Sequence, residues 1–252
     1  MTSQRILITG ASAGIGAALA ELYAARHGAE LTLGLVARRA ERLAELAGRL
    51  QGHGARVLSY AADVRDRARM AEVAREFVAA AGGCTLAIAN AGVSRPDGLA
   101  SGDAAPAADT VLVNVAGVIH TLQPLIPTLI AQGHGHLVTI GSVAGFRGLP
   151  GKGAYCASKA AVKMLMDAWR PELRGHGIRV STICPGWVVS ELTAQNAYPM
   201  PFLMDTPKAA RLIARAIARG RATYVFPWQM RLAVPLMKAL PDRLLANLSA
   251  RA

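Results

Sequence analysis

Short runs of aliphatic and β-branched residues alternate with longer helical patterns along the chain, and this alternation constrains the fold more than any other feature. Strands are expected at residues 5–9, 31–37, 56–61, 86–90, 136–142, 179–184 and 223–226. Helices are expected at 14–27, 40–51, 67–81, 107–131, 154–174 and 208–219, with a kink or an earlier end at Pro171. The pattern predicts one α/β domain over residues 1–252, a parallel sheet with helices on both faces.

The composition supports a large buried core, and it places the positive charge unevenly. Hydrophobic residues make up 52% of the 252 residues, and the formal net charge is +12. Residues 207–252 hold nine lysines and arginines against one acid, Asp242. This surplus indicates a solvated arginine-rich surface, with attraction to anionic lipid or to a phosphorylated ligand as alternatives. Because no nucleic-acid recognition motif accompanies the charge, we expect no nucleic-acid partner.

The cysteines and the apolar stretches argue for a cytoplasmic protein. Cys84, Cys156 and Cys184 are too few and too scattered for a disulfide framework or a zinc site, so we expect reduced thiols and no metal. The uncharged stretch 111–131 is long enough for a membrane span, but it contains two prolines and several polar residues. It is expected to be a helix buried between layers or subunits, and we expect no signal peptide or lipidation signal.

A glycine-rich turn joins the first predicted strand to the first predicted helix. The residues Thr9-Gly10-x-x-x-Gly14-x-Gly16 have a spacing of G-x-x-x-G-x-G. Glycines let a ligand approach the backbone, and the free N–H groups at a helix start suit a pyrophosphate. A plain turn would need the same residues. The position between strand and helix favours a dinucleotide site.

The end of the second predicted strand indicates which dinucleotide binds. An NAD(H) site requires an acid there for the ribose 2′-hydroxyl, whereas this strand ends in Ala37 followed by Arg38 and Arg39. Guanidinium groups suit a 2′-phosphate. The sequence therefore favours NADP(H), with NAD(H) as the alternative.

Four polar residues form a candidate proton-transfer set. Tyr155 and Lys159 are four residues apart on one predicted helix and therefore share a face. A nearby ammonium stabilises the phenolate and lowers a tyrosine pKa, although a Tyr-x-x-x-Lys pair is also common on helix surfaces. Ser142 ends the preceding predicted strand, where it is expected to hydrogen-bond a substrate oxygen. Asn114 lies on the apolar 111–131 stretch, where a buried amide needs a partner.

Together these pieces resemble the short-chain dehydrogenase/reductase family, across the chain to about Phe226. The matching pieces are Thr9-Gly10-x-x-x-Gly14-x-Gly16, Asp63-Val64, Asn90-Ala91-Gly92, Asn114, Ser142, Tyr155-x-x-x-Lys159 and Pro185-Gly186. The resemblance implies a Rossmann-type, doubly wound parallel sheet of about seven strands. It implies a catalytic set of Asn114, Ser142, Tyr155 and Lys159. It implies that the cofactor contacts Gly10, Ser12, Gly14, Ile15, Gly16, Arg38, Arg39, Asp63, Val64, Asn90, Ala91, Gly92, Tyr155, Lys159, Pro185, Gly186, Val188 and Ser190.

The resemblance also assigns roles within that set. Asp63 and Val64 would contact the adenine, and Asn90 would support the cofactor and the sheet. Lys159 would bind the nicotinamide ribose. The residues that would flank the nicotinamide are Pro185, Gly186 and Val188, with Ser190 where the family often has a threonine. Ala13 departs from the basic residue of many NADP-preferring members, so the cofactor preference depends on Arg38 and Arg39.

The resulting functional prediction is an NADP(H)-dependent oxidoreductase acting on a small, apolar carbonyl or alcohol. Tyr155 would serve as general acid or base, Ser142 would stabilise the developing alkoxide, and Asn114 would hold a water that links Lys159 to solvent. Two alternatives stay open. One is an NAD(H)-dependent alcohol or hydroxysteroid dehydrogenase of the same fold, and the other is a non-catalytic regulator that senses NADP(H).

The remaining predictions concern the substrate side, the tail and assembly. Residues 191–206 are expected to form a substrate lid. In the basic and apolar tail at 227–252, Pro235 and Pro241 are expected to break the chain into short pieces. The tail would cover the pocket or contact a subunit, with peripheral membrane contact as the alternative. A homodimer or homotetramer is expected, through the helices at 111–131 and 154–174.

Overall fold

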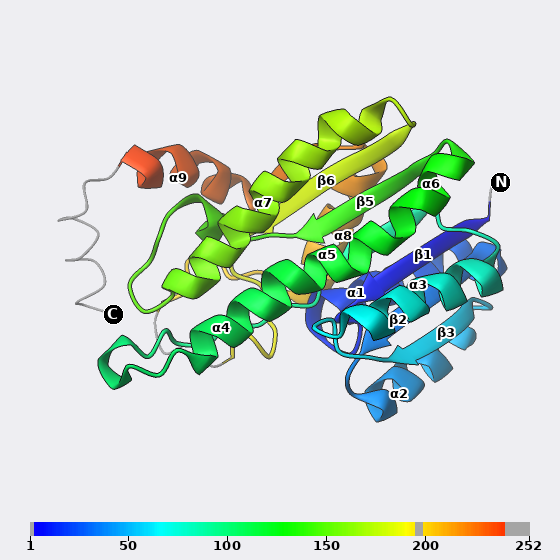
Figure 1. The fold of residues 1–252 in the computed structure, drawn as a ribbon, viewed down its shortest axis with the longest axis horizontal. Coiled ribbons are helices and arrows are strands. Elements are labelled where there is room, and N and C mark those ends of the chain that lie inside the picture. The colour runs from blue at the N-terminus through cyan, green and yellow to red at the C-terminus, as the bar shows by residue number, and fades with distance from the viewer. Residues whose placement is uncertain (1–2, 195–198, 240–252) are drawn as a thin grey trace.

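The computed structural model describes residues 3–194 and 199–239, with side chains described as far as Leu236. Seven parallel strands form one sheet in the order β3-β2-β1-β4-β5-β6-β7 (Figure 1). The strands are β1 (Gln4–Thr9), β2 (Leu31–Ala37), β3 (Arg56–Ala61), β4 (Leu86–Ala89), β5 (Gly135–Ile140), β6 (Ile178–Pro185) and β7 (Thr223–Phe226). The order reverses between β1 and β4, and ligands bind at such a reversal, beyond the carboxyl ends of the strands.

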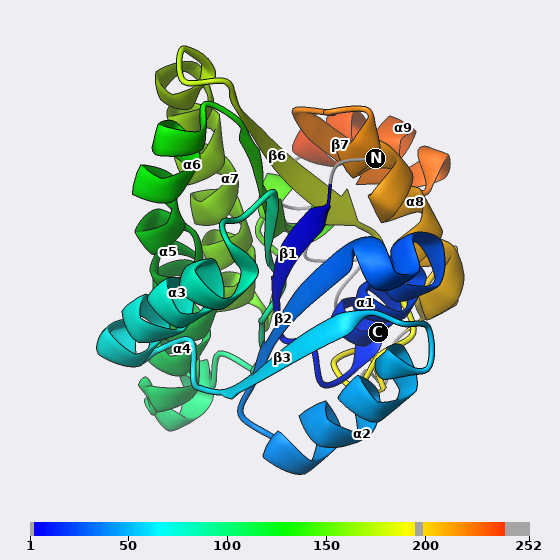
Figure 2. The same ribbon diagram turned by 90° about the vertical axis from the view of Figure 1, so that its right-hand side faces the viewer.

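Two layers of helices enclose the sheet (Figure 2). One face is covered by α1 (Gly14–His27), α2 (Ala40–Gln51) and α8 (Thr206–Ala218). The other face is covered by α3 (Arg67–Ala81), the α4–α6 run and α7 (Gly153–Arg174). A short helix, α9 (Trp228–Ala239), follows β7. The predicted doubly wound, Rossmann-type architecture is confirmed.

The strands are apolar because both faces of the sheet are buried. Along β1, Ile6 and Ile8 pack into the core beneath α1, whereas Leu7 between them packs into the core on the opposite face. This period of two places successive side chains in different layers. Every residue of β4 and β5 is buried, as expected for central parallel strands.

The apolar stretch predicted as one helix at 107–131 is a helical run with two irregular turns. It comprises α4 (Ala105–Val111), the π-helical turn η3 (Leu112–Ala116), α5 (Gly117–Leu122), the 3₁₀ turn η4 (Gln123–Leu125) and α6 (Ile126–Gln132). Among the described residues, this run, Ala105–Gln132, has the length and hydropathy of a membrane span. In the structure, Val113, Leu122 and Leu129 pack into the core beneath it. The stretch therefore belongs to the layer of helices that covers one face of the sheet, as predicted from its prolines and polar residues.

Several predicted boundaries are wrong. The strand expected to reach Ser142 ends at Ile140, because the chain there turns into the 3₁₀ helix η5 (Val143–Phe146). By contrast, the predicted end of the helix at Arg174 is confirmed, and Pro171 does not end α7 earlier, because a proline so near the end removes only one of the last hydrogen bonds. Pro235 lies inside α9 and does not divide it, since packing of Met230 and Val234 holds the helix. Pro241 lies outside the described residues.

Candidate active site

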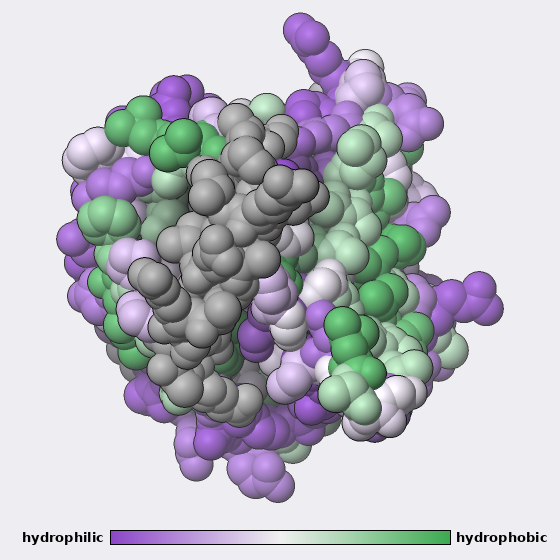
Figure 3. Space-filling model, turned by 90° about the vertical axis from the view of Figure 1, so that its left-hand side faces the viewer, coloured by the Kyte–Doolittle hydropathy of each residue, from purple (hydrophilic) through white to green (hydrophobic). Residues whose placement is uncertain are grey.

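The parallel sheet brings the carboxyl ends of its strands to one edge of the molecule, the edge that faces the viewer in Figure 3. Predicted site residues follow β1, β2, β4, β5 and β6, and all of these strands end at that edge. Hydrophobic and hydrophilic surface alternate over this face in Figure 3. In the segments that follow β6 and β7, Val189, Phe202, Leu203 and Trp228 are exposed large hydrophobic residues. The sheet topology therefore gathers segments that are far apart in the sequence.

The glycine-rich turn after β1 is packed so closely that side chains would not fit. A Cβ on Gly16 would lie 2.4 Å from the Gly10 carbonyl oxygen, and a Cβ on Gly10 would lie 2.8 Å from the Ala91 Cα. Gly10 also has a φ of 65°, which favours glycine. Helix α1 begins at Gly14, and the side chain of Ala13 before it forms no cap hydrogen bond, so the N-terminal end of the helix presents backbone N–H groups at the strand edge. A pyrophosphate fits this cradle.

Asn90 ties the glycine-rich turn to the end of β4. Its Nδ2 donates to the carbonyl oxygens of Thr9 at 3.0 Å and Gly10 at 3.1 Å. Thr9 was not predicted as a site residue, yet its buried Oγ1 accepts from the backbone N–H groups of Asn90 at 3.2 Å and Ala91 at 3.3 Å. The threonine before the first glycine was the available signal. These bonds fix the shape of the cradle before any ligand binds.

Arginines gather where β2 ends and α2 begins. Arg38 is 62% exposed and reaches Asp63 only at 4.0 Å, so its guanidinium stays accessible. Arg39 points to the glycine-rich turn, where it donates to the Ser12 Oγ from Nη2 at 3.1 Å and from Nε at 3.3 Å. The residues there fit the 2′-phosphate of NADP(H), because guanidinium forks match phosphate oxygens.

Asp63, after β3, is held mainly by a neighbour in the chain. The Arg65 guanidinium donates to both carboxylate oxygens, with the shortest contact at 2.6 Å, and the Arg65 N–H donates to Oδ1 at 2.9 Å. These bonds hold the pKa of the Asp63 carboxyl below its usual range. The adjacent Val64 is buried and lies against Gly117 of α5. The pair stands at the strand edge, where the resemblance places the adenine.

Lys159 is a buried cation beside Tyr155. Its Nζ donates to the Ile140 carbonyl oxygen at 2.9 Å and lies 5.7 Å from the centroid of the Tyr155 ring. Desolvation by burial lowers the pKa of Lys159 from 10.5 to about 8. The Tyr155 side chain is half-buried on the same face of α7. An ammonium held this near the phenol favours its ionised form, which is the arrangement that proton transfer by a tyrosine needs.

Asn114 lies in the π-helical turn η3, where it is fully buried. Its Oδ1 accepts from the Val93 N–H at 2.9 Å, and its Nδ2 donates to the Val93 carbonyl at 2.9 Å and to the Ser158 Oγ at 3.0 Å. Ser158, which was not predicted, in turn donates to the Tyr155 carbonyl at 2.7 Å. Asn114 therefore holds the chain after β4 against the helix that carries Tyr155. Such π-helical turns occur often at functional sites.

Ser142 and the start of α7 lie beyond β5. Ser142 caps η5, because its Oγ accepts from the Ala144 N–H at 3.1 Å. Asp97, another residue not predicted, caps α7: its carboxylate accepts from the N–H of Ala154 at 3.0 Å and from that of Gly153. A carboxylate at a helix start is stabilised by the helix dipole. Asp97 thus orients the turn that carries Tyr155, and its position in a loop far upstream gave no sequence signal.

The chain after β6 closes the nicotinamide end of the predicted site. Pro185 ends β6, and the Gly186 N–H donates to the Phe226 carbonyl at 2.7 Å. A Cβ on Gly186 would lie 3.0 Å from the Met230 Cγ of α9. Val188 is buried and forms a bridge with Met204. Helix α9 therefore packs beside the residue that follows β6. Whether the tail covers the pocket stays a prediction, and residues 240–252 lie outside the described residues.

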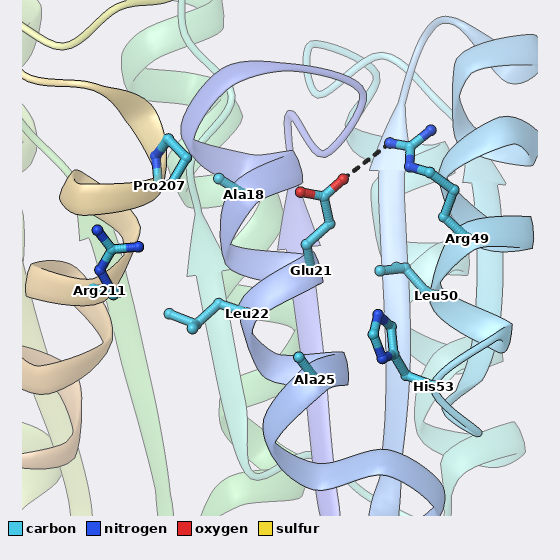
Figure 4. A pocket seen from close by; sticks show the side chains of 9 residues that line it. All are labelled: Ala18, Glu21, Leu22, Ala25, Arg49, Leu50, His53, Pro207 and Arg211. Carbon is cyan, nitrogen blue, oxygen red and sulfur yellow. Dashed lines mark hydrogen bonds and ion pairs between the residues drawn. The ribbon is translucent and has the colours of Figure 1, made fainter.

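A separate hollow lies on the outer surface between α1, α2 and α8, with a volume of about 370 Å³ (Figure 4). Its lining comprises Ala18, Glu21, Leu22, Ala25, Arg49, Leu50, His53, Pro207 and Arg211. None of these is a predicted site residue. The candidate active site is therefore the strand edge.

Comparisons with known proteins agree with this geometry. The family model for short chain dehydrogenase matches residues 4–199. An uncharacterized oxidoreductase of Myxococcus xanthus is 40% identical over 247 residues, covering 97% of this chain and 95% of the relative. A short chain dehydrogenase/reductase from Burkholderia phymatum, solved with NAD, is 27% identical with a TM-score of 0.83, and the match covers 93% of each chain. A short-chain dehydrogenase from Sphingobium yanoikuyae, solved with NADPH, is 28% identical with a TM-score of 0.81, covering 94% of this chain and 96% of that one.

The fold and the strand-edge site define a dinucleotide-binding oxidoreductase of Rossmann type. The chain belongs to the short-chain dehydrogenase family, as the resemblance predicted. It is an enzyme that acts on CH–OH or C=O groups of small molecules with a nicotinamide cofactor.

Proposed function

We propose that this enzyme uses NADP(H) and interconverts an apolar ketone or aldehyde with its alcohol, with Tyr155 as the general acid or base. The observation that carries the proposal is the buried Lys159 ammonium, 5.7 Å from the centre of the Tyr155 ring at the edge that also holds the glycine-rich turn. Burying a charged group costs free energy, so a buried ammonium is expected to have a function. We infer that its function is to stabilise the phenolate of Tyr155.

The chemistry divides among four side chains. The cofactor supplies or accepts a hydride. Tyr155 donates a proton to the carbonyl oxygen in reduction and accepts it in oxidation. Ser142 donates a hydrogen bond to the same oxygen and stabilises the charge that develops there. Lys159 favours the phenolate, and Asn114 holds the segment after β4 against α7 so that this geometry persists. To its predicted role of holding a water beside Lys159 we add this structural role, because the Asn114 amide contacts Val93 on one side and Ser158 on the other.

The cofactor preference is proposed from the arginines after β2. No acid stands at the end of this strand for a ribose 2′-hydroxyl, and the accessible Arg38 guanidinium suits a 2′-phosphate. A relative in structure binds NAD and another binds NADPH, so the family admits both cofactors. The NAD(H)-dependent alternative is thus the result to test against.

A thermal-shift titration with NADPH, NADH or neither tests the preference, because stabilisation follows affinity. We expect the larger shift with NADPH. Arg38→Ala should remove most of the NADPH advantage and leave the NADH shift nearly unchanged. A larger shift with NADH in the wild type would contradict the proposed preference and favour the NAD(H)-dependent alternative.

The surface supports an apolar substrate and an oligomer. Val189, Phe202 and Leu203 are exposed beside the nicotinamide end of the predicted site, where they would contact an apolar substrate.

On the α4–α7 side, Val111, Leu112, Ile130 and Met164 are exposed large hydrophobic residues. We infer that a second copy covers them in a homodimer or homotetramer. Light scattering on the purified protein tests this, and a monomer at micromolar concentration would contradict it.

A further inference from the structure

Glu191 joins the substrate side of the site to the arginines at the start of α2. Its carboxylate accepts from the Arg39 Nη1, at 3.0 Å to Oε2 and 3.1 Å to Oε1, and it also pairs with Arg42. These residues are about 150 positions apart in the sequence. The arginines hold the pKa of the Glu191 carboxyl below its usual range, so it is ionised at neutral pH.

A compact turn presents Glu191 to these cations. The Thr193 Oγ1 donates to the Val188 carbonyl at 2.7 Å and accepts from the Ser190 N–H at 2.9 Å. The Ser190 Cβ in turn lies 3.4 Å from where a Cβ on Gly14 would stand. Residues 190–193 therefore rest against the glycine-rich turn. Glu191 is the first residue of the predicted substrate lid at 191–206.

One of these arginines, Arg39, follows the end of β2, where a 2′-phosphate is expected, and Arg42 lies one helical turn further along the chain. In the structure, the Arg39 guanidinium donates to the Ser12 Oγ and to the Glu191 carboxylate. A phosphate is a stronger acceptor than a carboxylate and carries more charge at pH 7. The Glu191 carboxylate and a 2′-phosphate would therefore compete for the same guanidinium donors. NAD(H) has an uncharged 2′-hydroxyl in place of the phosphate and would not compete with Glu191.

We propose that Glu191 occupies the cationic 2′-phosphate subsite of the free enzyme, and that NADP(H), but not NAD(H), must displace it from Arg39 and Arg42. This inference depends on the proposed NADP(H) preference. Two consequences follow. Glu191 moderates the affinity for NADP(H), and binding of NADP(H) separates the Glu191 carboxylate from the arginines at the start of α2.

Isothermal titration of the full-length protein with NADPH and with NADH tests this proposal. In Glu191→Gln the competing charge is gone, so the Kd for NADPH should fall about threefold to tenfold, a modest range because the side chains are solvent-exposed. The Kd for NADH should stay within about twofold. The matched control is Glu21→Gln, which removes a similar exposed pair, Glu21–Arg49 at 3.0 Å, from the outer hollow (Figure 4). It should change neither Kd.

Three results would overturn the proposal: an unchanged Kd for NADPH, a weaker one, or an equal gain for both cofactors. A higher Kd for both NADPH and NADH in Glu191→Gln would show that Glu191 helps to hold the bound cofactor in place. Titration with adenosine 2′,5′-bisphosphate and with 5′-AMP repeats the comparison without nicotinamide, and only the bisphosphate should gain affinity in Glu191→Gln. The wild-type ratio of NADPH to NADH affinity tests the proposed preference, whereas the change in that ratio on substitution tests the role of Glu191.

Discussion

Burial of Lys159 makes a specific prediction about stability and pH. Its pKa is lowered from 10.5 to about 8 by desolvation, in a side chain that is almost completely buried. One pKa unit corresponds to about 1.4 kcal/mol, so the charged lysine lowers the free energy of unfolding by about 3 kcal/mol. Lys159→Met keeps the length of the side chain and removes the charge.

The sign of the pH dependence follows from the two pKa values. Below pH 8, the lysine is protonated in both the folded and the unfolded chain, and the cost of burying the charge is present in full. Between pH 8 and 10.5, the folded protein loses the proton first, so the cost fades as the pH rises. The stability of the wild type should therefore increase relative to Lys159→Met by about 3 kcal/mol over this window.

Urea denaturation of both proteins between pH 7 and 10.5 measures this difference. Burial raises the pKa of the Cys84 and Cys184 thiols to about 12, so these groups also make stability depend on pH. Both proteins contain them, and the comparison largely cancels their effect. A stability difference that stays constant across the window would show that Lys159 does not carry a buried charge at neutral pH, and would refute the reasoning.

Three further substitutions test the frame of the site. Gly16→Ala would place a Cβ 2.4 Å from a backbone oxygen, and should lower the free energy of unfolding by about 1–3 kcal/mol and remove the NADPH-dependent thermal shift; Gly48→Ala, with open space around it, is the control and should be neutral or stabilising. Asn114→Ala leaves the partly buried Val93 N–H without its partner, so urea denaturation should show a loss of about 1–3 kcal/mol, and turnover should fall; unchanged stability would contradict the role of the amide. Asp97→Ala removes the cap of α7 and should lower the free energy of unfolding by about 1 kcal/mol; an unchanged free energy of unfolding would contradict the role of this cap.

The sequence predicted the elements well because the periodicity of buried positions is a local signal. The wrong boundaries have local causes that such a pattern does not carry. Ser142 left its strand because its hydroxyl caps a 3₁₀ turn, and Pro235 stayed inside α9 because tertiary packing outweighed one lost hydrogen bond. Propensity is overridden by packing in this way throughout folded proteins.

The site residues that sequence reasoning missed act across long separations. Glu191 lies in the predicted lid, but its pairing with Arg39 was not predicted, because the two residues meet only where the carboxyl ends of parallel strands converge. Ser158 lies one position before Lys159, and no sequence pattern distinguishes it from any other serine inside a helix. Asp97 caps a helix that begins more than fifty residues later. A single sequence shows which residues could carry chemistry, whereas the pairs that position them become visible only in the fold.

The central claim is that Tyr155 transfers the proton in an NADPH-dependent carbonyl reduction. The most direct test is single-turnover oxidation of NADPH by wild type and Tyr155→Phe with a carbonyl that the wild type reduces, with NADPH binding measured in parallel. We predict a loss of at least ~100-fold in turnover, the usual scale for a missing general acid, while NADPH binding stays intact. Near-normal turnover in Tyr155→Phe would contradict the account.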